Sequence, residues 1–230
     1  MESRESNSLP SHVAVFGAAG GLGKGILDVC RENGIGFTAI VRSRPERIAN
    51  VPAGSRVEVV ASLKDESALS DAFAGAEAVL TAVGVTATSF DNTALLSQNM
   101  ATLEKAMLRA DINRVVVMNT LLSPSPGEPA SLLMRFFSCI PGKIGRGARE
   151  LKAVVDALGR GEFSRLNWTL VRGGVNISGV NESPLASLDW SQGLNSWRPV
   201  SYQAMGLWML QESVAGRFIK AAPFVSRKRD

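Results

Sequence analysis

The chain has 230 residues, of which 45% are hydrophobic, so it can bury a sizeable core, and disordered and low-complexity classes are excluded. Two cysteines and one histidine exclude a disulfide scaffold and a histidine-based metal site, and no apolar run reaches the roughly 18–20 residues that span a bilayer. The formal net charge of +4 comes from residues 217–230, with five basic side chains and one acid, so we expect neither a nucleic-acid nor a membrane partner.

Short apolar runs alternate with helical patterns along most of the chain. In order, we expect a strand at 12–16, a helix at 21–33, strands at 37–41 and 56–61, a helix at 64–73, a strand at 78–83, a helix at 91–109 and a strand at 115–118. Then follow a helix at 147–158, a strand at 168–171, a helix at 201–214 and a last strand within 218–225. Wholly apolar strands separated by helices indicate an α/β fold, with a doubly wound parallel sheet covered on both faces.

Two segments interrupt this alternation. Residues 121–147 contain the apolar stretch LLMRFFSCI, which is either a short helix over a cleft or a helix covering the sheet edge, and residues 173–200 show little periodicity. We expect a polar leader at 1–10 and a single domain at 11–230, in which these segments form a small C-terminal substrate lid. The leader lacks the apolar stretch of a secretory signal, which favours a cytoplasmic protein.

The first expected strand runs directly into a glycine-rich loop, GAAGGLG, and a helix follows. In this context the first glycine permits a tight turn, the middle positions let the backbone approach a pyrophosphate, and the last lets helix and strand pack closely. The helix N-terminus adds free N–H donors and the positive end of a dipole. We therefore predict a dinucleotide site of the Rossmann type, formed by Gly17, Ala19, Gly20, Gly21, Leu22 and Gly23.

The end of the second strand indicates which dinucleotide binds. Folds that bind NAD tend to place an acid about 20 residues beyond the glycines, where it holds the ribose hydroxyls. Here the sequence is Val41-Arg42-Ser43-Arg44, and no acid occurs before Glu46. Because arginine offers paired donors to phosphate oxygens, we predict NADP(H), with Arg42 on the 2′-phosphate. Arg44 either assists or begins a solvated loop.

Together with AVLTAVG, RVVVMNT and WTLVRGG at the fourth, fifth and sixth strands, these motifs resemble the atypical short-chain dehydrogenase/reductase superfamily over residues 12–225. Within it, the sequence is most similar to small NAD(P)-binding proteins of the biliverdin-IXβ/flavin reductase and NmrA-like type. The resemblance implies further cofactor contacts at the adenine (Ser62, Leu63), along the ribose and nicotinamide path (Ala82, Val83, Gly84) and at the nicotinamide end (Gly173, Gly174, Val175).

The catalytic residues of that superfamily are only partly present. Classical members use a Ser or Thr, a Tyr, and a Lys four residues later, whose cation lowers the pKa of the phenol that exchanges a proton with the substrate. Thr120 matches the hydroxyl and Lys152 the lysine, and both would also contact the cofactor, but Ala148 occupies the tyrosine position. The only tyrosine, Tyr202, is either a proton donor folded over the cleft or a half-buried packing residue.

Three functions remain open at this stage. The first is an NADPH-dependent reductase that acts on a hydrophobic or conjugated small molecule, with solvent supplying the proton. The second is an isomerase or cyclase of a biosynthetic pathway, and the third is an NmrA-like NADP(H)-binding redox sensor. The aromatic residues of the two irregular segments either belong to an ordinary core or line a pocket for an apolar ligand. We predict that the substrate contacts Phe136, Phe137, Asn176 and Trp197. We expect the protein to be a monomer or a homodimer.

Overall fold

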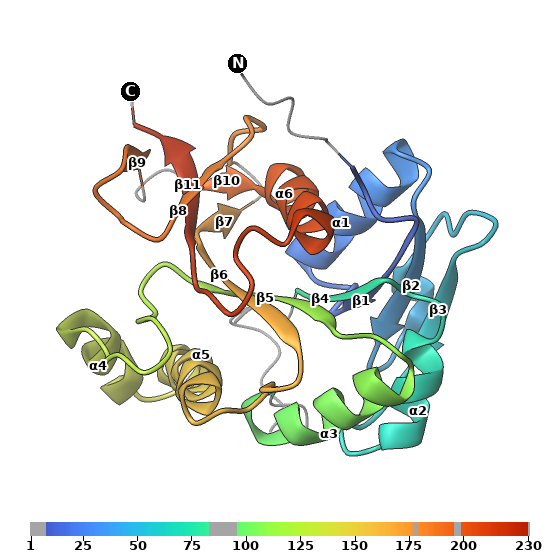
Figure 1. The fold of residues 1–230 in the computed structure, drawn as a ribbon, viewed down its shortest axis with the longest axis horizontal. Helices are drawn as coiled ribbons and strands as arrows, with labels where there is room; N and C mark the ends of the chain where they lie inside the picture. Colours follow the sequence, from blue (N-terminus) through green and yellow to red (C-terminus); the bar gives the residue numbers. More distant parts are fainter. Residues whose placement is uncertain (1–7, 83–95, 177–178, 196–198, 230) are drawn as a thin grey trace.

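A computed structural model describes residues 8–82, 96–176, 179–195 and 199–229 (Figure 1). Its strands are β1 (His12–Phe16), β2 (Gly36–Val41), β3 (Arg56–Val59), β4 (Ala78–Thr81), β5 (Arg114–Thr120), β6 (Asn167–Gly173), β7 (Val175–Asn176), β8 (Leu185–Ser187), β9 (Leu194–Asn195), β10 (Val200–Ser201) and β11 (Phe224–Lys228). Its helices are α1 (Gly21–Glu32), the short η1 (Pro45–Arg47), α2 (Glu66–Phe73), α3 (Leu96–Arg109), α4 (Leu132–Cys139), α5 (Lys143–Gly159) and α6 (Tyr202–Ala215).

The main sheet confirms the predicted doubly wound topology. Its strands lie in the order β3-β2-β1-β4-β5-β6-β11-β8, and the pairs from β3 to β11 are parallel. The chain winds outward from β1 to β3, then returns to β4 on the other side of β1. This reversal creates a switch point at the carboxyl ends of β1 and β4, which is where ligands bind in open α/β sheets.

Helices cover both faces of the sheet (Figure 1). One core cluster joins the sheet to α2, α3 and α5, and the other joins it to α1 and α6. Helix α4 lies at the side of the molecule and packs against α5 (Figure 1). The segment LLMRFFSCI is therefore helical as predicted, but its packing partner is another helix. Two residues of the expected leader, Leu9 and Pro10, already belong to the folded part, since Leu9 packs on the core and Pro10 is buried.

Several boundaries differ from those expected. Helix α5 begins at Lys143, four residues before the predicted start, and β11 begins at Phe224 because residues 217–220 form a turn. The irregular segment 173–200 contains the short strands β7 to β10, of which β8 and β9 run antiparallel to β11. Strands of two or three residues are too short to produce a readable alternation in the sequence. The expected start of the helix at 91–109 lies outside the described residues.

Two glycines let α6 pack very closely on α1. A Cβ atom at Gly25 would lie 2.7 Å from the Cβ of Tyr202, and one at Gly206 would lie 3.1 Å from the Cα of Ile26. Each contact places a helix backbone where an ordinary side chain would stand. Ser201 begins α6 and its hydroxyl accepts a hydrogen bond from the N–H of Ala204 at 3.0 Å. The first turn of α6 is therefore fixed beside the first turn of α1.

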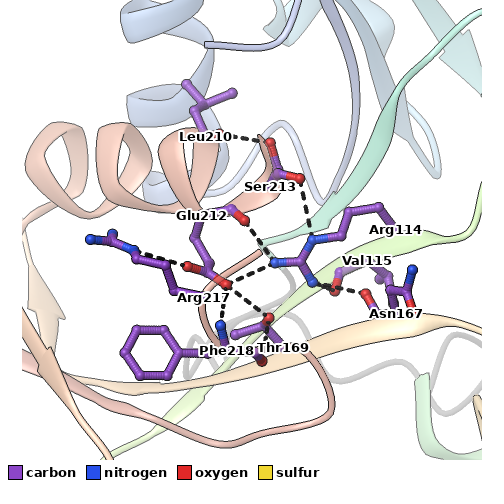
Figure 2. Close-up of polar contacts among 9 residues, drawn as sticks. All are labelled: Arg114, Val115, Asn167, Thr169, Leu210, Glu212, Ser213, Arg217 and Phe218. Atoms are coloured by element: carbon purple, nitrogen blue, oxygen red, sulfur yellow. Dashed lines mark hydrogen bonds and ion pairs between the residues drawn. The ribbon is translucent and has the colours of Figure 1, made fainter. Parts of the chain in front are cut away.

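A buried ionic network fixes the other end of α6 to the sheet (Figure 2). The guanidinium of Arg114, at the start of β5, lies 3.0 Å from the carboxylate of Glu212 and also donates to the carbonyl of that residue. The N–H of Phe218 donates to the same carboxylate at 2.9 Å. Burial lowers the pKa of Arg114, and the charge of Glu212 opposes that shift.

Among the described residues, no helix is both long enough and apolar enough to cross a bilayer. The same residues contain no cluster of three or more His, Cys, Asp or Glu side chains with metal-binding geometry.

Candidate cofactor site

The glycine-rich loop has the geometry that its sequence predicts. Gly17 leaves β1 with a φ of +83°, and its carbonyl accepts a hydrogen bond from the N–H of Gly20 at 3.0 Å. A Cβ atom at Gly23 would lie 2.4 Å from the Gly17 carbonyl oxygen, so no side chain fits there. Helix α1 then begins at Gly21 with no side-chain cap and no acid in its first turn. Its first N–H groups are therefore available to an anion.

An arginine that sequence reasoning missed lies against this loop. Arg47 donates a hydrogen bond from its guanidinium to the carbonyl of Ala19 at 3.1 Å. The chain reaches this position because Arg44 adopts a left-handed conformation, with a φ of +58°, and Pro45 then starts the one-turn helix η1. The sequence Arg44-Pro45 was a usable signal of a turn, but spacing alone did not show that the turn would bring Arg47 back to the loop.

The predicted phosphate contact, Arg42, follows directly after β2 and is exposed. Because β2 neighbours β1, the carboxyl ends of both strands lie at the same edge of the sheet as the glycine loop. Arg42 and Arg44 therefore follow β2 at this edge of the sheet, and Arg47 contacts the loop through the carbonyl of Ala19.

The adenine and ribose contacts are only partly described. The Ser62 hydroxyl accepts a hydrogen bond from the N–H of Lys64 at 3.2 Å, and Leu63 is buried in the core. Ala82 continues the pairing of β4, since its N–H donates to the carbonyl of Phe16 at 2.8 Å. Val83 and Gly84 lie outside the described residues. The nearby Thr81 hydroxyl is buried and has no hydrogen-bond partner among the described residues.

Sheet register brings together two of the predicted groups at the nicotinamide end. Thr120, the last residue of β5, pairs with Gly173, the last residue of β6. The Thr120 N–H donates to the side-chain carbonyl of Asn119 at 2.7 Å, and the amide of Asn119 donates to the carbonyl of Leu151 on α5 at 3.1 Å. Asn119 thus ties the strand end to the helix that carries Lys152. Nothing in its sequence context indicated this role.

Close packing at two glycines and a short strand pair fix the chain at the end of β6. At Gly173, a Cβ atom would lie 2.7 Å from the Cε of Met205, and at Gly174 it would lie 3.0 Å from a methyl group of Leu121. Val175 pairs with Val200 in the two-stranded sheet. Beneath them, the buried guanidinium of Arg172 lies 3.6 Å from the ring centre of Phe224 and donates to the carbonyl of Ala222. Burial lowers the pKa of Arg172.

The predicted catalytic side chains lie on different elements. Lys152 on α5 is partly exposed and forms an ion pair with Asp156 at 2.5 Å, one turn further along the helix. Ala148, which occupies the position of the classical tyrosine, is buried on the same helix. Tyr202 lies elsewhere: a Cβ atom at Gly21 would be 2.6 Å from its ring and 2.9 Å from its hydroxyl oxygen. The phenol ring therefore lies against Gly21 where a side chain would stand, and its hydroxyl forms no hydrogen bond within the described residues.

The predicted substrate residues are scattered. Phe136 and Phe137 meet edge to face on α4, with ring centres 5.9 Å apart, and Phe136 is 64% exposed. The backbone of Asn176 pairs with that of Ser201 in the two-stranded sheet. Trp197 lies outside the described residues. Of the other tryptophans, Trp168 and Trp208 are buried in the core.

Comparison with known families agrees with this geometry. The model of a family described as NAD(P)H-binding matches residues 17–183, from the first glycine of the loop to beyond β7. The chain belongs to this NAD(P)H-binding family. The match spans most of the chain, which makes the protein an NAD(P)H-binding protein. The predicted resemblance to NAD(P)-binding Rossmann proteins is thereby confirmed. No curated protein matches the sequence.

Solved structures show the same fold at low sequence identity. A candidate NADH-flavin reductase from Streptococcus pneumoniae is 19% identical with a TM-score of 0.67, covering 95% of this chain and 100% of that one. A wide-type short-chain dehydrogenase/reductase from Veillonella parvula, in complex with NADP, is 19% identical with a TM-score of 0.63, covering 95% of both chains. A candidate epimerase from Bacteroides thetaiotaomicron is 16% identical with a TM-score of 0.71, covering 96% and 99%.

Proposed function

We propose that the protein is an NADPH-dependent reductase that delivers hydride to a hydrophobic or conjugated small molecule without a tyrosine proton donor. One observation carries the proposal. The glycine loop has an uncapped helix N-terminus and a guanidinium bonded to it, whereas the position four residues before Lys152 is the buried Ala148. The chain therefore retains groups suited to the cofactor and lacks the phenol of the classical reaction.

Each part of the site has a role in this proposal. The first N–H groups of α1 would bind the pyrophosphate, and Arg42 and Arg47 would neutralise the 2′-phosphate. Thr120 and the backbone at Gly173 would orient the nicotinamide end. The Lys152 ammonium would donate a hydrogen bond to the ribose, either in place of its ion pair with Asp156 or in addition to it. When bound, NADPH supplies the hydride.

The reaction balances without a protein acid. The acceptor gains a hydride from NADPH and a proton from water, and NADP⁺ is released. A conjugated acceptor such as a flavin, a quinone or an enone spreads the developing negative charge, so that positioning alone gives a large rate gain. A simple ketone concentrates that charge on one oxygen and depends more strongly on an acid. The predicted acceptor is therefore conjugated.

The direct test is a turnover assay. Purified protein is mixed with NADPH and a panel of flavins, quinones, enones and simple ketones, and loss of nicotinamide absorbance is followed. We expect turnover with at least one conjugated acceptor and none with simple ketones. Tight NADPH binding without turnover on any acceptor would overturn the reductase proposal and favour an isomerase, a cyclase or a redox sensor. Preference for simple ketones would overturn the proposed acceptor class.

A further inference from the structure

Helix α4 and the first turn of α5 present large apolar side chains to solvent. Leu132 is 82% exposed and Phe136 is 64% exposed, and Leu133 and Ile144 are exposed as well. Four such residues within a short segment form what we call the α4 patch: Leu132, Leu133, Phe136 and Ile144. A concentrated apolar surface of this kind marks an interaction site more often than a scatter of single exposed residues does.

The patch is held in place by ordered contacts. Met134, on the opposite side of α4, is buried, and its N–H donates to the Ser131 hydroxyl at 3.2 Å to begin the helix. Near the other end, Arg149 of α5 donates to the carbonyl of Ser138 at 2.6 Å. The apolar side chains are therefore exposed because α5 fixes the orientation of α4.

Positive charge surrounds the patch. Arg135 and Arg146 are exposed, and neither has an ion-pair partner among the described residues. The sequence from 129 to 149 contains Arg135, Lys143, Arg146 and Arg149 and no acid. The next acids along the chain, Glu128 and Glu150, are hydrogen-bonded to Ser125 and Ser97. An apolar helix face with exposed arginines beside it matches the chemistry of an anionic lipid surface.

We propose that the α4 patch binds peripherally to membranes that contain anionic lipid, with Leu132 and Phe136 entering the acyl boundary and Arg135 and Arg146 facing the headgroups. A second copy of the chain fits less well, because a symmetric contact would bring the same unpaired cations of both copies together. The proposal is independent of the reductase function. It departs from two expectations of the sequence, because Phe136 faces lipid in place of substrate and a membrane surface becomes a partner.

Vesicle cosedimentation tests the binding. We expect the protein to pellet with phosphatidylcholine vesicles that contain phosphatidylglycerol, and not with phosphatidylcholine alone. Replacing both Arg135 and Arg146 by Gln should weaken binding roughly 30-fold, at about 1 kcal/mol for each cation. Phe136→Ser combined with Leu132→Ser should abolish pelleting, whereas Leu188→Ser, at a leucine outside the patch that is 59% exposed, should not affect it. Equal pelleting on neutral and anionic vesicles would overturn the proposal.

A fluorescent probe locates the contact independently of pelleting. Cys139 at the end of α4 is exposed, whereas Cys30 is buried, so a thiol-reactive, polarity-sensitive dye attaches next to the patch. We expect a blue shift of its emission on anionic vesicles. The same dye at Lys105→Cys, in a Cys139→Ser background, should show none, because Lys105 is exposed on α3. No shift at Cys139, or light scattering that shows a dimer dissociated by Phe136→Ser, would overturn lipid as the occupant.

Discussion

The carboxylate of Glu212 is completely buried and lies 3.0 Å from the guanidinium of Arg114. This contact joins the last turns of α6 to the first residue of β5, at the end of the sheet opposite to the glycine loop (Figure 2). The Thr169 hydroxyl and the N–H of Phe218 each donate a hydrogen bond to the same carboxylate. These hydrogen bonds all reach Oε1, whereas the buried Oε2 has no hydrogen bond among the described residues and lies 3.6 Å from the guanidinium of Arg217. The buried charge therefore depends on its two arginine partners.

Removing one charge of this pair should be costly. Glu212→Leu leaves Arg114 buried without its counter-charge, so we expect the free energy of unfolding to fall by about 3–5 kcal/mol. Urea denaturation followed by circular dichroism measures the loss. Glu58→Leu is the matched control, because Glu58 pairs with Arg56 at 3.2 Å on the surface and should contribute about 0–1 kcal/mol. Similar losses for the two variants would contradict the role given to burial.

Arg47→Ala tests cofactor selectivity. A charge-assisted hydrogen bond to a phosphate contributes about 1.5–3 kcal/mol, so NADPH affinity should fall roughly 10- to 100-fold while NADH affinity changes little. Arg42→Ala should show the same selectivity. Titration calorimetry with both nucleotides provides the measurement, and Arg160→Ala, at an exposed arginine after α5, serves as control. Equal losses for NADPH and NADH would mean that Arg47 only supports the loop through Ala19.

Tyr202→Phe separates packing from proton donation. The ring would still lie on Gly21 and only the hydroxyl would be lost, so we expect kcat for a conjugated acceptor to change less than about twofold. Steady-state kinetics across a pH range gives the readout. A decrease of about 100-fold or more would make Tyr202 the proton donor after all.

Gly23→Ala should impair both folding and cofactor binding. Its new methyl group would lie 2.4 Å from the carbonyl oxygen of Gly17, and backbone cannot yield as a flexible side chain can. We expect a destabilisation of about 1–3 kcal/mol and loss of NADPH binding. Thermal unfolding with and without NADPH measures both effects. Gly20→Ala, with a contact of 3.3 Å to the same oxygen, should destabilise the protein less.

The two cysteines should differ sharply in reactivity. Burial raises the pKa of Cys30 to about 12, so at mildly alkaline pH its thiol stays protonated and inert, whereas Cys139 is exposed. A chromogenic disulfide reagent should therefore modify one thiol per native chain and two after unfolding in denaturant. Rapid modification of both thiols in the native protein would contradict the burial of Cys30.

The regular part of the fold could be predicted because its signals are local. The apolar run His12–Phe16 and the glycines at 17, 20 and 23 determine a strand, a turn and a helix within a few residues of one another. Thr120 and Gly173 could be expected at the same strand-end edge, since parallel strands end together.

Other features depend on contacts between distant segments. Arg47 reaches the loop only after the left-handed turn at Arg44, and Tyr202 reaches Gly21 only because α6 packs on α1. The tryptophans illustrate the same limit: Trp168 and Trp208 lie close to the irregular segment in sequence but pack inside the core. Hydrophobicity indicates that such residues are buried, and it does not indicate which surface covers them.

The two ends of strand β5 have different roles, one in the stability of the fold and one in the candidate cofactor site. Its first residue, Arg114, belongs to the buried ionic network, and its last, Thr120, belongs to the candidate cofactor site. Seven residues of extended chain place these ends about 20 Å apart, a distance at which substitutions act additively on stability. Residues around Thr120 can therefore change toward new acceptors during evolution while the Arg114 end preserves the fold that tolerates them.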